Sequence, residues 1–204
     1  MVNAVILNMT GIVLSGGENR RMGVDKAFLK IAGIPMIEHV LRTLKGVVQD
    51  VIIVTNSPHL YSACGVRVVT DAFDKRGPLT GIHSGLLHSR NEYNFVVACD
   101  MPFLNPGLLS FMASLSEGYD IVVPSCGGMF EPLHAVYRKG LLPLLEQQLR
   151  LEKRKIQDLF NTVRVRYVTE QEIDRFDPAR KSFKNLNTPQ EYEEAACADW
   201  ECRS

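Results

Sequence analysis

The feature that most constrains the fold is an alternation of short apolar runs with stretches of helical spacing. Seven runs are candidate strands: residues 10–15, 50–55, 66–70, 94–99, 120–125, 133–138 and 163–168. Their apolar residues are mostly continuous rather than strictly alternating with polar ones, which is typical of strands that are covered on both faces. Candidate helices lie between and after them, at residues 34–46, 79–89, 105–117, 138–150, 153–160 and 188–197. This order predicts a three-layer α/β fold around a mostly parallel sheet.

Two local signals refine this prediction. Pro35 suits the first turn of a helix that Gly46 would end. The pair Gly127-Gly128 indicates a hairpin turn, so we expect one antiparallel strand on the sheet. Because ligands of such folds bind outside the carboxyl ends of the strands, the residues that follow each strand are the candidates for a functional site.

Composition limits the classes of protein. The chain has 204 residues, which suits a single domain (1–204), with a short N-terminal extension and a C-terminal tail as the places where disorder is expected. Lys and Arg number 23, as do Asp and Glu, so no general basic field favours nucleic acid or an anionic membrane. Five scattered cysteines without a Cys-x-x-Cys pair indicate neither a disulfide framework nor a zinc site. With no signal peptide or membrane span in the sequence, we expect a cytoplasmic protein.

The segment LSGGENRRMGVDK directly follows the first candidate strand. Its glycines, Gly16 and Gly17 among them, let backbone amides approach a bound group closely. The segment also carries three cationic side chains: Arg20, Arg21 and Lys26. It matches neither G-x-x-x-x-G-K-[ST] nor G-x-G-x-x-G, which excludes a P-loop and the dinucleotide fingerprint. A phosphate-binding loop of another kind remains, and the alternative is an ordinary connection with solvated arginines.

Two aspartates come directly after candidate strands, Asp71 in VRVVTD and Asp100 in FVVACD. A carboxylate in this place can bind Mg²⁺ or a ribose hydroxyl, and its common alternative role is a helix cap or turn, which is favoured for Asp71 taken alone. After Asp100, we expect Pro102 to keep the chain extended and the carboxylate exposed, while Asn105 opens the next helix. Together with the cationic glycine segment, these aspartates predict a site for a nucleoside triphosphate with magnesium.

At this point the sequence resembles a known family. LSGGENRRMGVDK is similar to the signature L-[AS]-G-G-x-x-x-R-M-G-x-D-K of the molybdenum cofactor guanylyltransferases, the MobA family. Further segments resemble that family in the same order, at residues 71–86, 96–104, 131–138 and 185–192. The first motif is shared with sugar-phosphate nucleotidyltransferases, whereas the double glycine, G-P-L-x-G and N-x-N-T-P point to the guanylyltransferases. The resemblance implies a Rossmann-like three-layer α/β/α nucleotidyltransferase fold.

The resemblance also implies the reaction and its residues. GMP would pass from GTP to the terminal phosphate of molybdopterin, with release of pyrophosphate. The residues implied at the nucleotide are Leu14, Ser15, Gly16, Gly17, Lys26, Asn56, Asp71, Gly77 and Asp100. The implied catalytic residues are Arg21, Lys26 and Asp100. Asp100 would bind Mg²⁺. Asn56 is included because Val54 stands where many family members have an asparagine.

Asn185 and Asn187 match family asparagines near the phosphates and the molybdopterin. Without the resemblance they would be interpreted as turn residues before a helix that starts near Pro189. His134 and Cys126 are expected near the pterin, and neither receives a role, since a lone histidine on an apolar strand is usually structural.

The expected mechanism is in-line attack by a molybdopterin phosphate oxygen on the α-phosphorus of GTP, without a covalent intermediate. Two related activities remain as alternatives: a cytidylyltransferase of the same cofactor and a sugar-phosphate nucleotidyltransferase. Cytidylyltransferases tend to read L-A-A-G where this chain has LSGG, and the smaller Gly16 leaves more room for a purine. A third alternative is a non-catalytic nucleotide-binding adaptor, against which the retention of Lys26 and Asp100 argues. The expected partners are the two small substrates and, transiently, proteins that deliver and accept the cofactor.

Overall fold

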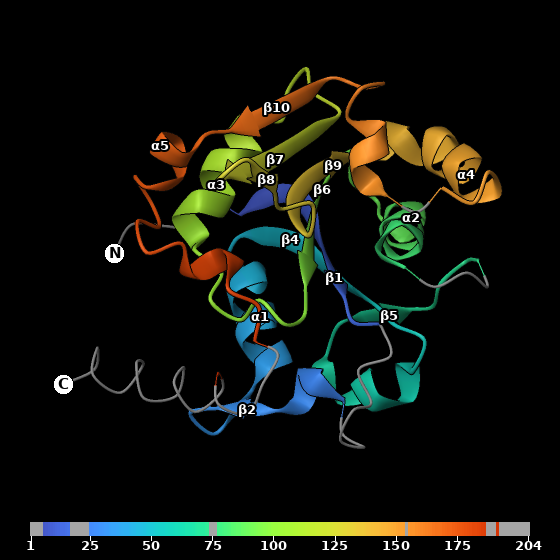
Figure 1. Ribbon diagram of the computed structural model, residues 1–204. Coiled ribbons are helices and arrows are strands. Elements are labelled where there is room, and N and C mark those ends of the chain that lie inside the picture. The colour runs from blue at the N-terminus through green and yellow to red at the C-terminus, as the bar shows by residue number, and fades with distance from the viewer. Residues whose placement is uncertain (1–5, 17–24, 74–76, 154, 187–190, 192–204) are drawn as a thin grey trace.

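The computed structural model describes residues 6–16, 25–73, 77–153, 155–186 and 191. Eight strands form its main sheet (Figure 1). They are β1 (Leu7–Leu14), β4 (Val48–Val54), β5 (Arg67–Val69), β6 (Tyr93–Ala98), β7 (Ile121–Cys126), β8 (Met129–Phe130), β9 (His134–Arg138) and β10 (Val165–Val168). The strand order is β10-β7-β9-β6-β1-β4-β5, with β8 paired to β7.

The sheet is mostly parallel, as predicted. β1 is parallel to both of its neighbours, β4 and β6, while β9 is antiparallel to both β6 and β7. The antiparallel strand expected in this part of the chain is therefore confirmed. The hairpin turn is confirmed as well, since β7 and β8 are joined by Gly127 (φ 57°) and Gly128 (φ 76°), backbone angles that favour glycine.

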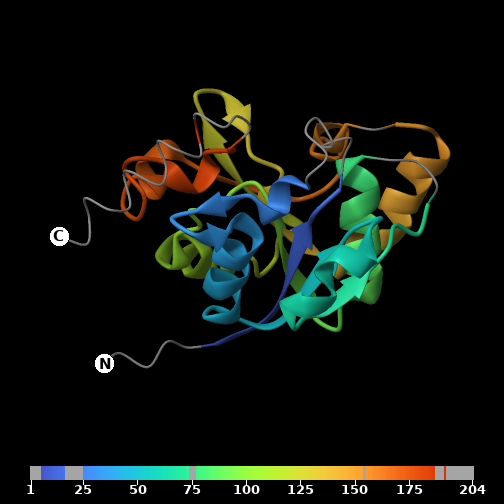
Figure 2. The same ribbon diagram turned by 90° about the horizontal axis from the view of Figure 1, so that it is seen from below.

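Helices cover both faces of the sheet. They are α1 (Met36–Lys45), α2 (Pro78–His88), α3 (Pro106–Ser114), α4 (Leu142–Arg150) and the short α5 (Glu170–Ile173). In Figure 2, α1 and α3 lie on one side of β1 and α2 and α4 on the other. The three-layer α/β/α prediction is thus confirmed.

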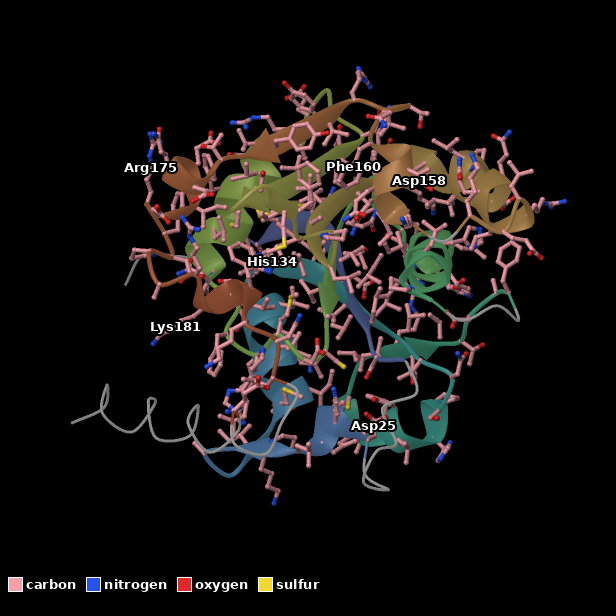
Figure 3. The ribbon with its side chains drawn as sticks, in the orientation of Figure 1. Asp25, His134, Asp158, Phe160, Arg175 and Lys181 are labelled. Carbon is pink, nitrogen blue, oxygen red and sulfur yellow. The ribbon has the colours of Figure 1, made fainter. Side chains whose placement is uncertain are left out.

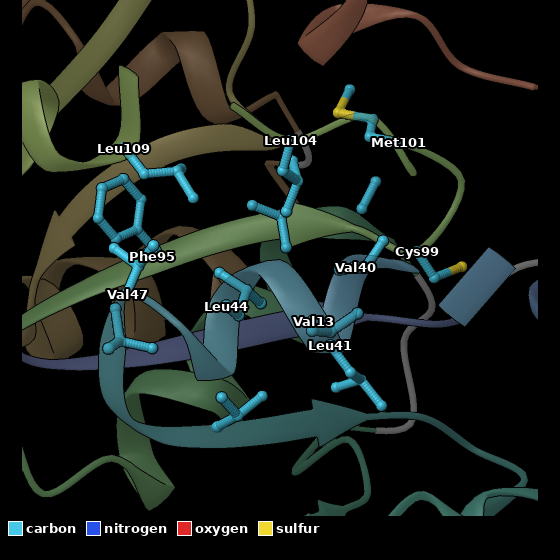
Figure 4. Close-up of a cluster of buried hydrophobic side chains, with 14 of the residues drawn as sticks. Val13, Val40, Leu41, Leu44, Val47, Phe95, Cys99, Met101, Leu104 and Leu109 are labelled. Carbon is cyan, nitrogen blue, oxygen red and sulfur yellow. The ribbon is translucent and has the colours of Figure 1, made fainter. Parts of the chain in front are cut away.

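Each face of the sheet has its own core. Ile12 and Val13 are neighbours on the central strand and both are completely buried, but they belong to different clusters because successive side chains of a strand point to opposite faces. Val13 packs with Leu41 and Phe95 in the cluster that α1 and α3 cover (Figure 4). On the other face α2 approaches so closely that a Cβ at Gly85 would collide with Ile12. Burial on both faces explains the continuous apolar runs.

Several boundaries differ from the predictions. Pro35 precedes α1 as its N-cap and belongs to a small hairpin, β2 (Lys30–Ile31) with β3 (Ile34–Pro35), that the apolar pattern did not indicate. The helix expected over 153–160 is only a 3-10 turn, Ile156–Leu159. The stretch 138–150 begins with another 3-10 turn, and its α-helix starts at Leu142.

Some predictions fall where the structure gives no description. The helix expected at 188–197 lies outside the described residues apart from Glu191, and so do the first five residues and the end of the tail. Within the described part of the chain, no helix has both the length and the apolar character needed to cross a membrane.

Candidate active site

Four neighbouring strands end at the same edge of the sheet. Leu14, the last residue of β1, is in register with Val54 of β4 and Ala98 of β6, and Val54 is in register with Val69 of β5. Backbone hydrogen bonds continue this alignment past the strand ends: the Ser15 amide donates to the Val54 carbonyl at 2.9 Å. The residues that follow these strands therefore lie side by side, as expected for the ligand-binding edge of such a fold.

Asn56 and Asp71 form a pair at this edge. The Asn56 amide nitrogen Nδ2 donates to Asp71 Oδ2 at 2.9 Å. Burial raises the pKa of Asp71, and the hydrogen bond from Asn56 partly offsets that effect. The other carboxylate oxygen, Oδ1, is buried and has no hydrogen-bond partner among the described residues. Asp71 does not cap α2, whose N-cap is Gly77, so Oδ1 is a buried acceptor that no described residue satisfies.

Asp100 departs from the prediction. The chain turns at this residue, with the Met101 amide donating to the Ala98 carbonyl at 3.3 Å, and the side chain is half-buried. The expected exposed carboxylate is wrong, because Asp100 lies half-buried within the turn that follows β6, whereas residues 101–105 form neither a helix nor a turn. Asn105 does cap α3 as expected, accepting from the Leu108 amide at 2.9 Å, so Asp100 is not needed as a cap.

The environment of Asp100 includes the charge of Lys26. Burial raises the pKa of the Asp100 carboxyl, while a backbone hydrogen bond and the Lys26 ammonium act in the opposite direction. Lys26 begins the 3-10 turn Lys26–Phe28, whose N-cap Asp25 accepts from the Ala27 amide at 3.1 Å. Two predicted catalytic residues from distant parts of the chain are thus electrostatically coupled.

A buried hydroxyl network lies beneath this edge, and the sequence analysis missed it. Ser15 Oγ and the Tyr61 hydroxyl are 2.5 Å apart, and that hydroxyl donates to Asp25 Oδ2 at 2.9 Å. Tyr61 lies in the 3-10 helix Pro58–Cys64, is completely buried, and packs its ring against Phe28 with centroids 5.0 Å apart. The resemblance implies a contact of Ser15 with the nucleotide but no hydrogen bond of its hydroxyl within the protein. No local pattern could have identified Tyr61, because its polar partners are distant in sequence.

The remaining predicted residues divide into two groups. Gly77 has φ 150°, an angle that favours glycine, and lies at the start of α2, while Gly16 and Asn185 are exposed. The Leu186 amide donates to the Asp100 carbonyl at 3.0 Å, which places the segment of Asn185 beside Asp100. Three predicted site residues lie outside the described part of the chain: Gly17, Arg21 and Asn187.

His134 is buried near the centre of the molecule (Figure 3). Its ring packs edge-on against Phe183, and neither ring nitrogen has a hydrogen-bond partner within the residues described. Burial lowers its pKa to about 4, so the ring is neutral at pH 7. Its burial is consistent with a structural residue, and we assign it no role in the site.

The fold and the polar strand-end edge are those of a nucleotidyltransferase. A sequence profile of the MobA-like NTP transferase domain matches residues 11–170. The chain belongs to this family, which confirms the resemblance drawn from the motifs.

Relatives with similar sequences carry names that agree with this family. A probable molybdenum cofactor guanylyltransferase of Pelotomaculum thermopropionicum is 42% identical over 184 residues, covering 90% of each chain. The molybdenum cofactor guanylyltransferase of Desulfosudis oleivorans is 40% identical, covering 93% of this chain and 95% of its own.

Solved structures agree on the fold. Molybdopterin-guanine dinucleotide biosynthesis protein A from Archaeoglobus fulgidus superposes with a TM-score of 0.82 at 28% identity, over 95% of this chain and 100% of its own. A 4-diphosphocytidyl-2C-methyl-D-erythritol synthase from Anaerococcus prevotii, at 14% identity and a TM-score of 0.70 over 95% and 96% of the chains, shares the fold alone.

Proposed function

We propose that this protein transfers GMP from GTP to the terminal phosphate of molybdopterin, forming molybdopterin guanine dinucleotide and releasing pyrophosphate. The observation that carries the proposal is the common edge at which β1, β4, β5 and β6 end. Residues expected at the nucleotide come directly after these strands and so lie near one another along this edge. The guanylyltransferase names of relatives at 40–42% identity over nine-tenths of the chain support the choice of reaction.

In this proposal the nucleotide lies along the edge. Backbone groups of the Leu14–Gly17 segment contact it, and Lys26 and Arg21 neutralise its phosphates. The unpartnered oxygen of Asp71, with Asn56 beside it, can accept from a donor-rich group such as the guanine edge or a ribose hydroxyl. Asn185 and Asn187 face the molybdopterin, and the bond between Leu186 and Asp100 supports this placement for Asn185.

Magnesium dependence is part of the proposal. Among the described residues no three His, Cys, Asp or Glu side chains are grouped as a metal cage. Mg²⁺ in nucleotide sites commonly uses one or two carboxylates, with phosphates and water as the other ligands, and the Asp100 carboxylate fits that donor set. A bound Mg²⁺ would neutralise charge on the phosphates, and the raised pKa of Asp100 is consistent with a carboxyl that lacks a full internal counterion.

This chain's own residues would carry the rest of the reaction. Lys26 and Arg21 would stabilise the charge that develops on the leaving pyrophosphate, while the edge holds the α-phosphorus in line with the attacking phosphate oxygen. No side-chain nucleophile is required. The proposal also includes one domain for the whole chain, a cytoplasmic location where GTP is present, and transient contacts with proteins that deliver and accept the cofactor.

A nucleotide comparison tests the proposal. Thermal unfolding should shift upward more with GTP–Mg²⁺ than with CTP–Mg²⁺, ATP–Mg²⁺ or UTP–Mg²⁺, because a ligand at 100 times its Kd adds about 2.7 kcal/mol to the stability of the folded state. Pyrophosphate should then appear when GTP, Mg²⁺ and molybdopterin are mixed with the protein. A larger shift with CTP would favour the cytidylyltransferase, and binding without pyrophosphate release would favour the adaptor.

A further inference from the structure

The hydroxyl of Tyr61 lies between two residues that are far from it and from each other in the sequence. It is bonded to Ser15, which directly follows β1, and to Asp25, which directly precedes Lys26. Tyr61 itself comes from the 3-10 helix after β4. One buried oxygen therefore connects three segments that meet at the candidate active site.

The direction of these hydrogen bonds follows from the chemistry of the groups. A carboxylate only accepts, so the Tyr61 hydroxyl donates to Asp25 and must accept from the Ser15 hydroxyl. The single proton of the Ser15 hydroxyl is thereby directed at the Tyr61 oxygen. Burial raises the pKa of Tyr61 above its usual range, and that of Cys99 to about 12, so both groups keep their protons.

Two turns that carry residues proposed for catalysis are joined to the end of β1. Asp25 precedes Lys26 and is reached through Tyr61, whereas Cys99, which precedes Asp100, donates its backbone amide to the Leu14 carbonyl at 3.0 Å. Asp25 uses both carboxylate oxygens: Oδ1 accepts from the Ala27 amide at the start of the 3-10 turn, and Oδ2 accepts from Tyr61. The start of the turn that carries Lys26 is thereby connected to the end of β1.

We propose that Tyr61 is a positioning residue for nucleotidyl transfer, holding the Lys26 turn in register with the end of β1 through Asp25 and Ser15. The inference rests on the proposed function. Tyr61 is completely buried beneath these residues, and so it acts on a bound nucleotide through them rather than by contact. Small displacements of phosphate-binding groups are costly for transfer reactions, which gives a single buried hydroxyl a measurable role.

The test compares two tyrosines. Tyr61→Phe removes the hydroxyl and keeps the ring against Phe28. Tyr137→Phe is the matched control, since Tyr137 is also completely buried and donates one hydrogen bond, at 2.8 Å, to the Pro132 carbonyl. Both variants should unfold at a lower temperature than wild type. Only Tyr61→Phe should lower kcat/KM for GTP, by about tenfold, with the KM for molybdopterin changed less.

A second pair of variants addresses the hydrogen-bonded chain itself and covers the case in which Tyr61→Phe does not fold. Ser15→Ala should lower kcat/KM for GTP about threefold in wild type and have little further effect in Tyr61→Phe. Equal losses of GTP turnover in Tyr61→Phe and Tyr137→Phe, no loss in Ser15→Ala, or additive effects of the two substitutions would overturn the inference.

The outcome separates this inference from the proposed function. If wild type uses another nucleoside triphosphate, the proposed function is wrong, and the same variants compared with that nucleotide decide the role of Tyr61. If wild type binds no nucleotide, both the proposed function and the inference are wrong.

Discussion

Two pairs of carboxylates, one pair from each half of the sheet, are in opposite electrostatic environments. In the half formed by β1, β4, β5 and β6, burial raises the pKa of both Asp71 and Asp100. In the half formed by β7, β9 and β10, hydrogen bonds from arginines outweigh burial and hold the pKa of Asp120 and Glu172 below their usual values. Arg164 serves Asp120 in this way.

The direction of the pKa shift distinguishes carboxylates whose charge is compensated within the protein from carboxylates whose charge is not. Asp120 joins the start of β7 to Arg164 before β10 and to Arg138 of β9, so its charge is compensated within the protein. Asp71 has an amide partner on one oxygen and, among the described residues, none on the other. A buried carboxylate without full compensation is a candidate for function, because its cost in stability is recovered when a ligand binds.

The largest predicted effect is that of Asp100→Asn. This substitution keeps the shape of the side chain and removes its charge, so pyrophosphate release should fall by at least about a hundredfold, the scale of a lost metal contact. A magnesium titration of turnover, with circular dichroism to check folding, measures the loss. Asp120→Asn is the matched control from the other half, and it should retain turnover. Wild-type turnover in Asp100→Asn at ordinary magnesium would remove Asp100 from the site.

The next effect is that of Lys26→Ala. If Lys26 neutralises the phosphates as proposed, removing its ammonium group should weaken GTP binding by about tenfold to a hundredfold, the range for hydrogen bonds to charged groups. Isothermal titration with GTP–Mg²⁺ measures this change. Lys45→Ala is a suitable control, because Lys45 is exposed at the end of α1 and donates only a 3.3 Å hydrogen bond to the Cys64 carbonyl. Equal GTP affinities of the two variants would contradict a phosphate role for Lys26.

Asp71→Asn should have a smaller effect. An amide keeps one acceptor but loses the charge and can turn its nitrogen toward the ligand, so GTP affinity should fall by about threefold to tenfold. Affinity for molybdopterin should be unchanged. Asp71 follows β5 and pairs with Asn56 after β4, whereas the pterin is expected near Asn185. Competition binding with both substrates decides the point, and a loss confined to molybdopterin would reverse the assignment.

The smallest effect concerns stability against pH in the absence of ligands. Since folding raises the pKa of Asp100, that carboxyl favours the folded state most below its unfolded pKa, and the advantage is lost as pH rises through the folded pKa. Asp120 has the opposite sign: its contribution is present above its unfolded pKa and is lost as pH falls through the lowered folded pKa.

Replacing a carboxylate by an uncharged amide should therefore change the Tm in opposite directions in the two halves. At pH 7 Asp100→Asn should raise Tm and Asp120→Asn should lower it, each by about 1–4 °C for a chain of this size. The Asp100 difference should shrink as pH falls through its raised pKa, and the Asp120 difference should shrink only at lower pH, through its lowered pKa. Calorimetric scans across this range would show changes of the same sign if the two environments were alike.

Much of the fold could be predicted from local signals. The seven candidate strands all exist with boundaries shifted by a few residues, and Asn105 caps α3 as its sequence context indicates. The errors lie where local patterns are ambiguous. Residues 153–160 have helical spacing but form only a short 3-10 turn, and the hairpin of β2 and β3 is too short to show a strand pattern.

The candidate site was likewise only partly predictable from local sequence. Position after a strand made Asp71 and Asp100 candidates, because the carboxyl ends of parallel strands share one edge, but only the resemblance placed Asp71 at the nucleotide. Position was not enough to predict that Asp100 lies half-buried in a turn or that Tyr61 lies beneath the site.

What the sequence by itself determined is the order of the strands along the chain, the two-sided burial of the sheet and the chemical character of the segment after β1, because these depend on residues close together in sequence. Only the tertiary structure decided the pairing of Asn56 with Asp71, the coupling of Lys26 to Asp100 and the bridge from Ser15 through Tyr61 to Asp25. These contacts join residues far apart in the chain, and their strength comes from the burial that packing of the whole sheet creates.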